Sequence, residues 1–150
     1  MVRLYNKECE YAIRALVELA APARKGRRTA RAVCRRAGIP EAFARKAVQR
    51  LSQRGLLKAV RGPGGGYALA VEPRAVSVLD IITAIEGEGA LEQCVMGLPA
   101  CTDQRSCPMH GVWTSARRVL LDRLRSTTLR DLIGASEQSR AAGPEQRRGR

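Results

Sequence analysis

Residues 29–70 decide the fold class of this 150-residue chain: TARAVCRRAGIPEAFARKAVQRLSQRGLLKAVRGPGGGYALA. A short helix is predicted over residues 29–37, and Gly38-Ile39-Pro40 forms a tight turn after it. A second helix is predicted over residues 41–54, followed by Gly55 in a position that commonly ends a helix. Two helices joined by so short a turn are typical of a helix-turn-helix, in which the second helix reads DNA.

The predicted second helix has two faces of different character. Its apolar side chains recur at the spacing of one helix face and are expected to pack on the domain. The opposite face is basic and carries amides, and Arg and Gln can make paired hydrogen bonds to base edges. We therefore expect this face to lie in the major groove of DNA, with contacts from Ala42, Arg45, Lys46 and Gln49.

A β-hairpin wing is predicted directly after the second helix. Two short apolar strands, near residues 56–60 and 67–70, flank the glycine-rich tip RGPGGG. Glycine allows backbone angles and close approaches that a Cβ would forbid. A phosphate-binding loop is excluded, because no Gly-Lys-Ser/Thr follows and no helix begins there. The wing is expected to lie along a DNA groove, with contacts from Arg61, Gly64 and Gly65 and with Arg61 in the minor groove.

The net charge of +13 is concentrated in the first half of the chain. Residues 1–64 hold 16 Lys and Arg against 4 acids, whereas residues 65–150 hold 11 against 10. The basic residues could bind DNA or could simply face solvent. Because the positive charge coincides with the helix-turn-helix pattern, we favour double-stranded DNA as the partner. Such binding should weaken steeply as salt rises.

The remaining chain is also predicted to be helical, over residues 6–22, 77–86, 110–125 and 128–133. The helix over residues 110–125 has a broad apolar stripe, which a small winged-helix domain cannot cover alone, so we expect a homodimer. The stripe is formed by Trp113, Ala116, Leu120 and Leu124 and is widened by Val112, Val119 and Leu121.

Three cysteines and the only histidine lie within the run CVMGLPACTDQRSCPMH: Cys94, Cys101, Cys107 and His110. Cys and His side chains bind soft metals and iron–sulfur clusters, and a loop rich in Gly, Pro and polar residues lets them meet in space. Such ligands beside a DNA-binding module predict a sensor, in which a metal or iron–sulfur centre responds to conditions in the cell and changes DNA binding. Cys9 and Cys34 lie in predicted helices and are expected to be small packed side chains.

The composition also bears on compartment and chemistry. No apolar run approaches the ~20 residues of a membrane span, and the charged start MVRLYNKECEYAIRAL is not a secretory signal. We therefore expect a cytoplasmic protein with no membrane partner, in a compartment where disulfides are rare. Five cysteines is an odd number, so ligand or redox roles are favoured over a disulfide framework. A single histidine, without a recognisable nucleophile or carboxylate-pair motif, argues against an enzyme.

The fold class predicted from these patterns is mainly α with a small β-hairpin: a winged helix-turn-helix plus a long C-terminal dimerisation helix. Residues 1–86 are expected to form the winged helix-turn-helix domain and residues 87–108 a cysteine-rich cluster-binding loop. Residues 109–133 would form the dimerisation helix and a short C-terminal helix. Residues 134–150 contain little to bury, so a disordered tail is expected.

Several segments together resemble the cluster-binding branch of the Rrf-two family of winged-helix regulators, which includes IscR-, NsrR- and RirA-like members. The resemblance covers about residues 1–133. It is carried by RLYNKECEYAIRALVELA at residues 3–20, RGPGGGYAL at 61–69, the three cysteines, Trp113, and TLRDL at 128–132. It implies a homodimeric transcriptional regulator, a repressor, that binds a 2Fe–2S or 4Fe–4S cluster through three cysteines and one further ligand. Such a regulator would sense nitric oxide, redox or iron status.

The resemblance offers two candidates for the fourth ligand. His110 follows Cys107 by three residues and matches the histidine ligand of IscR-like members. Glu10 matches the acid that NsrR-like members supply from the partner subunit. Two alternatives to a cluster also stay open, a structural zinc on the same Cys and His residues and a thiol–disulfide switch. The Cys–Cys gaps are longer than the usual zinc-finger spacing of about two to four residues, and a thiol switch would leave His110 without a role.

Overall fold

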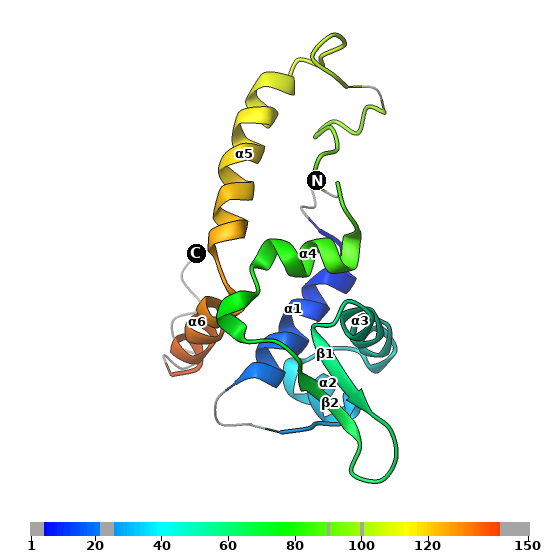
Figure 1. Ribbon diagram of the computed structural model, residues 1–150. Helices are drawn as coiled ribbons and strands as arrows, with labels where there is room; N and C mark the ends of the chain where they lie inside the picture. The colour runs from blue at the N-terminus through cyan, green and yellow to red at the C-terminus, as the bar shows by residue number, and fades with distance from the viewer. Residues whose placement is uncertain (1–4, 22–25, 90, 100, 142–150) are drawn as a thin grey trace.

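The computed structural model describes residues 5–21, 26–89, 91–99 and 101–141, apart from the side chains of residues 43 and 44. Within these ranges the chain is mainly helical with one small hairpin, as predicted (Figure 1). The elements in chain order are α1 (Lys7–Ala20), α2 (Ala30–Ala37), α3 (Glu41–Gln53), β1 (Leu57–Val60), β2 (Gly66–Leu69), the 3₁₀ turn η2 (Pro73–Ala75), α4 (Val78–Glu86), α5 (His110–Ser126) and α6 (Leu129–Ala141).

The helix-turn-helix is built on α1, against which α2 and α3 pack. The side-chain oxygen of Asn6 caps α1 by accepting a hydrogen bond of 2.9 Å from the backbone N–H of Cys9. Thr29 caps α2 in the same way, and Gly38 ends that helix in the left-handed region, with φ 65°. The core that these helices enclose is aliphatic, and its fully buried members include Ala12, Ala15, Leu16, Val33, Ala47, Val48 and Leu51.

The wing is an antiparallel hairpin of β1 and β2 in which Leu57 lies opposite Leu69. Its second strand also pairs with the segment before α2, because Arg28 and Tyr67 exchange backbone hydrogen bonds of 2.9 and 2.7 Å. A Cβ on Gly66 would collide with the carbonyl group of Arg28, so this close approach requires glycine. The pairing holds the base of the wing against the helix-turn-helix.

The helices α4 and α5 differ in how far they are buried against the winged helix-turn-helix. Ser77 and Asp80 form a capping box at the start of α4, and Ile81, Ile82 and Ile85 bury that helix in the shared core. In contrast, α5 has no buried residue, and Figure 1 shows it rising away from the body with the cysteine loop at its far end. Among the described residues, no helix is both long and apolar enough to cross a membrane.

The chain after α5 departs from the prediction. A disordered tail is expected from residue 134 onward, but α6 continues to Ala141. The prediction was wrong as far as Ala141, while residues 142–150 lie outside the described residues. Leu129 and Ile133 bury the start of this helix in the core. Near its end, the Nη2 of Arg140 lies 3.2 Å from the carboxylate of Glu18 on α1, a contact between distant parts of the sequence that no local pattern indicates.

Candidate DNA interface and metal centre

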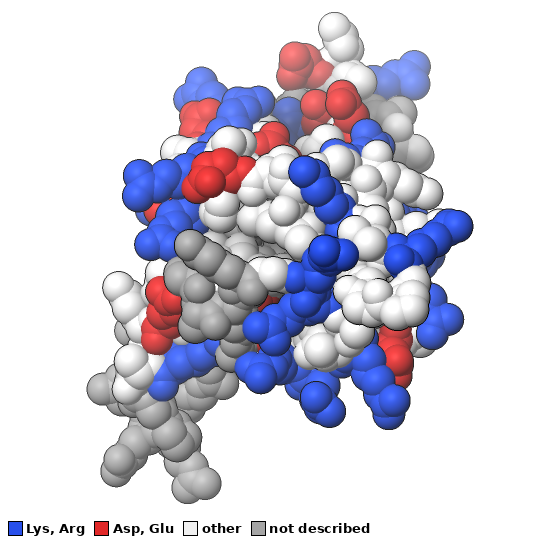
Figure 2. Space-filling model, turned by 60° about the horizontal axis from the view of Figure 1, so that its bottom comes forward, with Lys and Arg blue, Asp and Glu red and all other residues white. Residues whose placement is uncertain are grey.

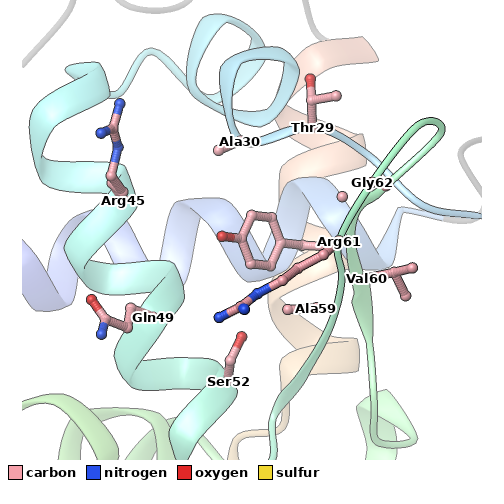
Figure 3. Close-up of a pocket in the computed structure, with 12 residues that line it drawn as sticks. Thr29, Ala30, Arg45, Gln49, Ser52, Ala59, Val60, Arg61 and Gly62 are labelled. Atoms are coloured by element: carbon pink, nitrogen blue, oxygen red, sulfur yellow. The ribbon is translucent and has the colours of Figure 1, made fainter.

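A cleft of about 550 Å³ opens between α3 and the wing. Its lining comes from the start of α2, the outer face of α3 and the hairpin, and includes Thr29, Ala30, Arg45, Gln49, Ser52, Arg61, Gly65 and Tyr67 (Figure 3). Guanidinium, amide and hydroxyl groups around a concave surface beside a helix-turn-helix suit the edge of a nucleic acid duplex.

Two of the predicted base-reading side chains, those of Arg45 and Gln49, lie on the face of α3 that borders this cleft, and both residues are exposed. Arg61 extends from the wing across the cleft toward Ser52 and Gln49 (Figure 3). The guanidinium of Arg61 therefore lies beside α3.

The other predicted DNA contacts lie outside this cleft. Ala42, Lys46 and Gly64 are exposed but are not part of its lining. The Nζ of Lys46 lies 3.7 Å from the carboxylate of Glu8 on α1, and the Nε of Arg50 lies 3.2 Å from the same carboxylate. Two basic side chains of α3 thus face α1, and Arg50 serves the packing of the domain.

Positive charge gathers on the face that carries α2, α3 and the wing. Figure 2 shows Lys and Arg over this face, with fewer Asp and Glu among them. The exposed basic residues of these elements include Arg31, Arg35, Arg36, Arg45, Lys46, Lys58 and Arg61. Such a surface attracts a polyanion over several ångströms and favours DNA binding at low salt.

The three cysteines of the loop meet at one point. Their Sγ atoms all lie within 4.8 Å of one another, and those of Cys94 and Cys107 are 3.7 Å apart. Within the described residues, no other set of three or more Cys, His, Asp or Glu side chains forms such a group. Cys9 and Cys34 are buried in the helical core, as predicted, and take no part in it.

The helix α5 anchors the start of this loop. The indole N–H of Trp113 donates a hydrogen bond of 2.8 Å to the carbonyl of Gln93, directly before the first cysteine. Arg117 donates one of 2.9 Å to the carbonyl of Glu92. The sequence pattern assigned Trp113 to the apolar stripe, and its polar role could not be foreseen because its partner lies 20 residues earlier in the chain.

His110 lies beside one of the three cysteines, Cys101, and is not itself part of the group that the three thiols form. Its Nδ1 lies 3.2 Å from the Sγ of Cys101, and its Nε2 lies 2.9 Å from the carboxylate of Asp103. Glu10 lies on α1 and is not part of the cysteine group of its own chain. Its carboxylate pairs instead with Lys7 and Arg14 at 2.7 and 2.6 Å.

The loop and the core create different environments for a thiol. Hydrogen bonds from backbone N–H groups, that of Leu98 foremost, lower the pKa of Cys94 to about 7. Burial raises the pKa of Cys9 to about 12 and also raises the pKa of Cys34. A backbone hydrogen bond at Cys107 lowers the pKa of Cys101, but burial and the neighbouring thiols of Cys107 and Cys94 raise it overall. Because the thiolate is the form that binds metals, the surroundings of Cys94 favour ligation and those of the core thiols oppose it.

Three residues of these sites were not singled out by the sequence pattern. Ser52 and Tyr67 line the cleft, and Asp103 contacts His110. Asp103 is an acid that lies between two candidate ligand cysteines, and this position could have marked it as part of the site. No spacing rule pointed to Ser52 or Tyr67, because the cleft forms only where the hairpin folds back beside α3.

A helix-turn-helix, a glycine-tipped wing and a basic cleft define a DNA-binding winged-helix protein. The Rrf2 family model, described as an iron-dependent transcriptional regulator, matches residues 5–135. The chain therefore belongs to the Rrf2 family of transcriptional regulators, the Rrf-two family that its sequence resembles.

Individual relatives agree with this membership. The chain is 32% identical over 102 residues to a putative HTH-type transcriptional regulator of Aquifex aeolicus, covering 67% of this chain and 71% of the relative. It is 30% identical over 136 residues to the HTH-type transcriptional regulator IscR of Erwinia tasmaniensis, covering 91% and 81%.

Solved structures show the same similarity. CymR, the global cysteine regulator of B. subtilis, superimposes with a TM-score of 0.73 at 26% identity, over 90% of this chain and 98% of that one. IscR of T. potens superimposes with a TM-score of 0.70 at 28% identity, over 89% and 88%.

Proposed function

We propose that this chain is an iron–sulfur cluster-dependent transcriptional repressor. The observation that carries the proposal is the meeting of three thiols within 4.8 Å in the loop before α5. Three soft sulfur donors beside an imidazole suit an iron–sulfur cluster, and the description of the family as iron-dependent supports the same assignment. Cys94, Cys101 and Cys107 would hold the cluster, with His110, or Glu10 of the partner subunit, as the fourth ligand.

When bound, a 2Fe–2S or 4Fe–4S cluster would supply iron that responds to nitric oxide, to redox state or to iron supply. The residues of the chain would carry the response toward the DNA. Trp113 and Arg117 of α5 donate hydrogen bonds to the loop, so a rearrangement of the cysteines would shift the position of that helix. A free-energy difference of about 1–3 kcal/mol between the two loop states would change DNA affinity roughly 5- to 150-fold.

The regulator would act as a homodimer through α5. Of the predicted apolar stripe, Leu121 and Leu124 pack against the core of their own domain. Val112 and Val119 are instead 65% and 68% exposed, with the exposed Ala116 between them on the same face. An apolar stripe on a helix that projects from its domain favours pairing with the same helix of a second copy. The two recognition helices would then meet half-sites about 34 Å apart.

Each α3 would lie in a major groove, where an Arg or Gln paired with a base typically contributes about 1–3 kcal/mol of discrimination. The wing would follow the adjacent backbone, and its glycines would allow a close approach. The contacts of α3 would come from Ala42, Arg45, Lys46 and Gln49, and those of the wing from Arg61, Gly64 and Gly65.

The proposal is tested by measuring iron, inorganic sulfide and zinc in protein purified without air, together with the visible spectrum. We expect a brown or red protein that contains iron and sulfide. Cys101→Ala should lose both and remain dimeric, whereas Cys34→Ala, which alters a buried thiol of α2, should keep its colour. Wild-type protein free of iron and sulfide would overturn the proposal.

A thiol–disulfide switch is the second candidate, and the 3.7 Å between the Sγ atoms of Cys94 and Cys107 favours it. Hydrogen peroxide would take two electrons and two protons from these thiols, leaving one S–S bond and two molecules of water. Colourless, metal-free protein that forms this disulfide would establish the switch. Stoichiometric zinc would instead establish a structural site on the same Cys and His residues.

A further inference from the structure

His110 lies between two groups of different chemistry. Its Nδ1 faces the Sγ of Cys101 at 3.2 Å, and its Nε2 lies 2.9 Å from an oxygen of the Asp103 carboxylate. The His110 side chain is 20% exposed, whereas that of Asp103 is 92% exposed. Nδ1 of the ring therefore faces the thiol of Cys101, and Nε2 faces the carboxylate of Asp103.

Backbone hydrogen bonds hold both partners of this contact near the cysteines. Thr102 and Arg105 pair N–H to carbonyl at 3.4 and 3.1 Å, which closes the turn that carries Asp103. The hydroxyl of Thr102 also accepts a hydrogen bond of 3.2 Å from the N–H of Arg105. The N–H of His110 donates to the carbonyl of Cys107 at 3.0 Å, so the start of α5 is tied to the third cysteine.

The contact with Asp103 determines which nitrogen of the ring carries the proton. An ionised carboxylate only accepts hydrogen bonds, so the proton of a neutral His110 lies on Nε2. Nδ1 then keeps a free lone pair, and this is the nitrogen that faces the sulfur of Cys101. A neutral imidazole whose other nitrogen donates to a carboxylate is the form in which histidine binds metals.

We propose that Asp103 is a positioning residue that keeps His110 in the Nε2–H tautomer, with Nδ1 free to bind iron. The inference rests on the proposed cluster site and takes as the fourth ligand His110, which the resemblance to IscR-like members already offers. Glu10 is less available, because it would have to leave Lys7 and Arg14, which lie 2.7 and 2.6 Å from its carboxylate.

The tautomer can be read directly, because the chain contains one histidine. Full-length, cluster-free protein labelled with nitrogen-15 histidine would be measured by NMR at a pH where the ring is neutral. We expect a protonated Nε2 in the wild type and a mixture of tautomers in Asp103→Ala. The matched control is Asp122→Ala, which removes an exposed charge from α5 outside the loop and should behave as the wild type. A protonated Nδ1 in the wild type, or a tautomer that Asp103→Ala leaves unchanged, would refute the inference.

A second measurement uses protein loaded with iron and sulfide without air. Removing the partner of a metal-binding histidine typically lowers metal affinity by about 10- to 100-fold. Asp103→Ala should therefore release iron to a chelator at least about tenfold faster than the wild type or Asp122→Ala, as followed by the loss of visible absorbance. Equal release rates would count against a role for Asp103. A failure of the cluster proposal is distinguishable, because the wild type would then hold no iron or sulfide, and the NMR measurement needs neither.

Discussion

The guanidinium of Arg50 on α3 donates a hydrogen bond of 2.7 Å to the backbone carbonyl of Ile85 near the end of α4. The same side chain lies 3.2 Å from the carboxylate of Glu8 on α1. The next residue, Glu86, accepts hydrogen bonds of 2.7 and 3.0 Å from the backbone and side-chain nitrogens of Asn6. The helix α3, the start of α1 and the last residues before the cysteine loop are therefore joined at one place.

Replacing Arg50 with Met should lower the free energy of unfolding by about 1–3 kcal/mol, as measured in urea. The carbonyl of Ile85 would lose its donor, and Glu8, whose side chain is 12% exposed, would lose the nearer of its two cations. Arg54→Met is the matched control, because it removes an exposed Arg just beyond the same helix. Equal unfolding free energies for the two variants would contradict this account.

Replacing Arg61 with Ala should weaken DNA binding and leave the iron content unchanged. The loss of one positive charge from the interface should make the slope of log affinity against log salt less negative by about 0.9, measured with mixed-sequence duplex DNA. Arg130→Ala, which alters an exposed residue of α6, should leave both the affinity and the slope near those of the wild type. An unchanged slope in Arg61→Ala would exclude this side chain from the interface.

Replacing Gly65 with Ala should disrupt the wing and reduce DNA affinity. A Cβ at this position would lie 2.7 Å from the carbonyl oxygen of Gly62 and would also collide with that of Val60. In contrast, Gly134→Ala fills open space in α6 and should raise the free energy of unfolding by about 0.5–1 kcal/mol. DNA binding and urea unfolding of both variants provide the measurement, and wild-type DNA affinity in Gly65→Ala would show that the turn tolerates a side chain.

Acid should weaken the start of α6 through Asp131. Its carboxylate accepts hydrogen bonds of 2.8 and 2.7 Å from the N–H and hydroxyl of Thr128, and these bonds lower the pKa of Asp131. A group whose pKa is lower in the folded chain stabilises the fold above its unfolded pKa, and that contribution is lost as the pH falls through the folded value. Unfolding free energies measured against pH should therefore differ between the wild type and Asp131→Asn near neutrality and converge in acid. A constant difference across this range would contradict the assignment.

The helices and the hairpin could be predicted from the sequence to within two residues at each end, apart from the end of α6. Their signals are local, because a cap, an apolar repeat or a glycine turn acts within a few neighbouring residues. The three cysteines could also be predicted as candidate ligands, since their residue type and their loop carry the chemistry.

The tertiary structure decided what depends on contacts across the chain. The helix α6 extends to Ala141, and its Arg140 contacts Glu18, which lies 122 positions away. The indole of Trp113 binds a loop carbonyl, although its spacing fits an apolar stripe. No local pattern specifies such pairings, because they depend on which helix faces share the core. The sequence by itself therefore determined the winged-helix class and the candidate ligands, and the tertiary structure alone brought the three thiols together and placed His110 on Asp103.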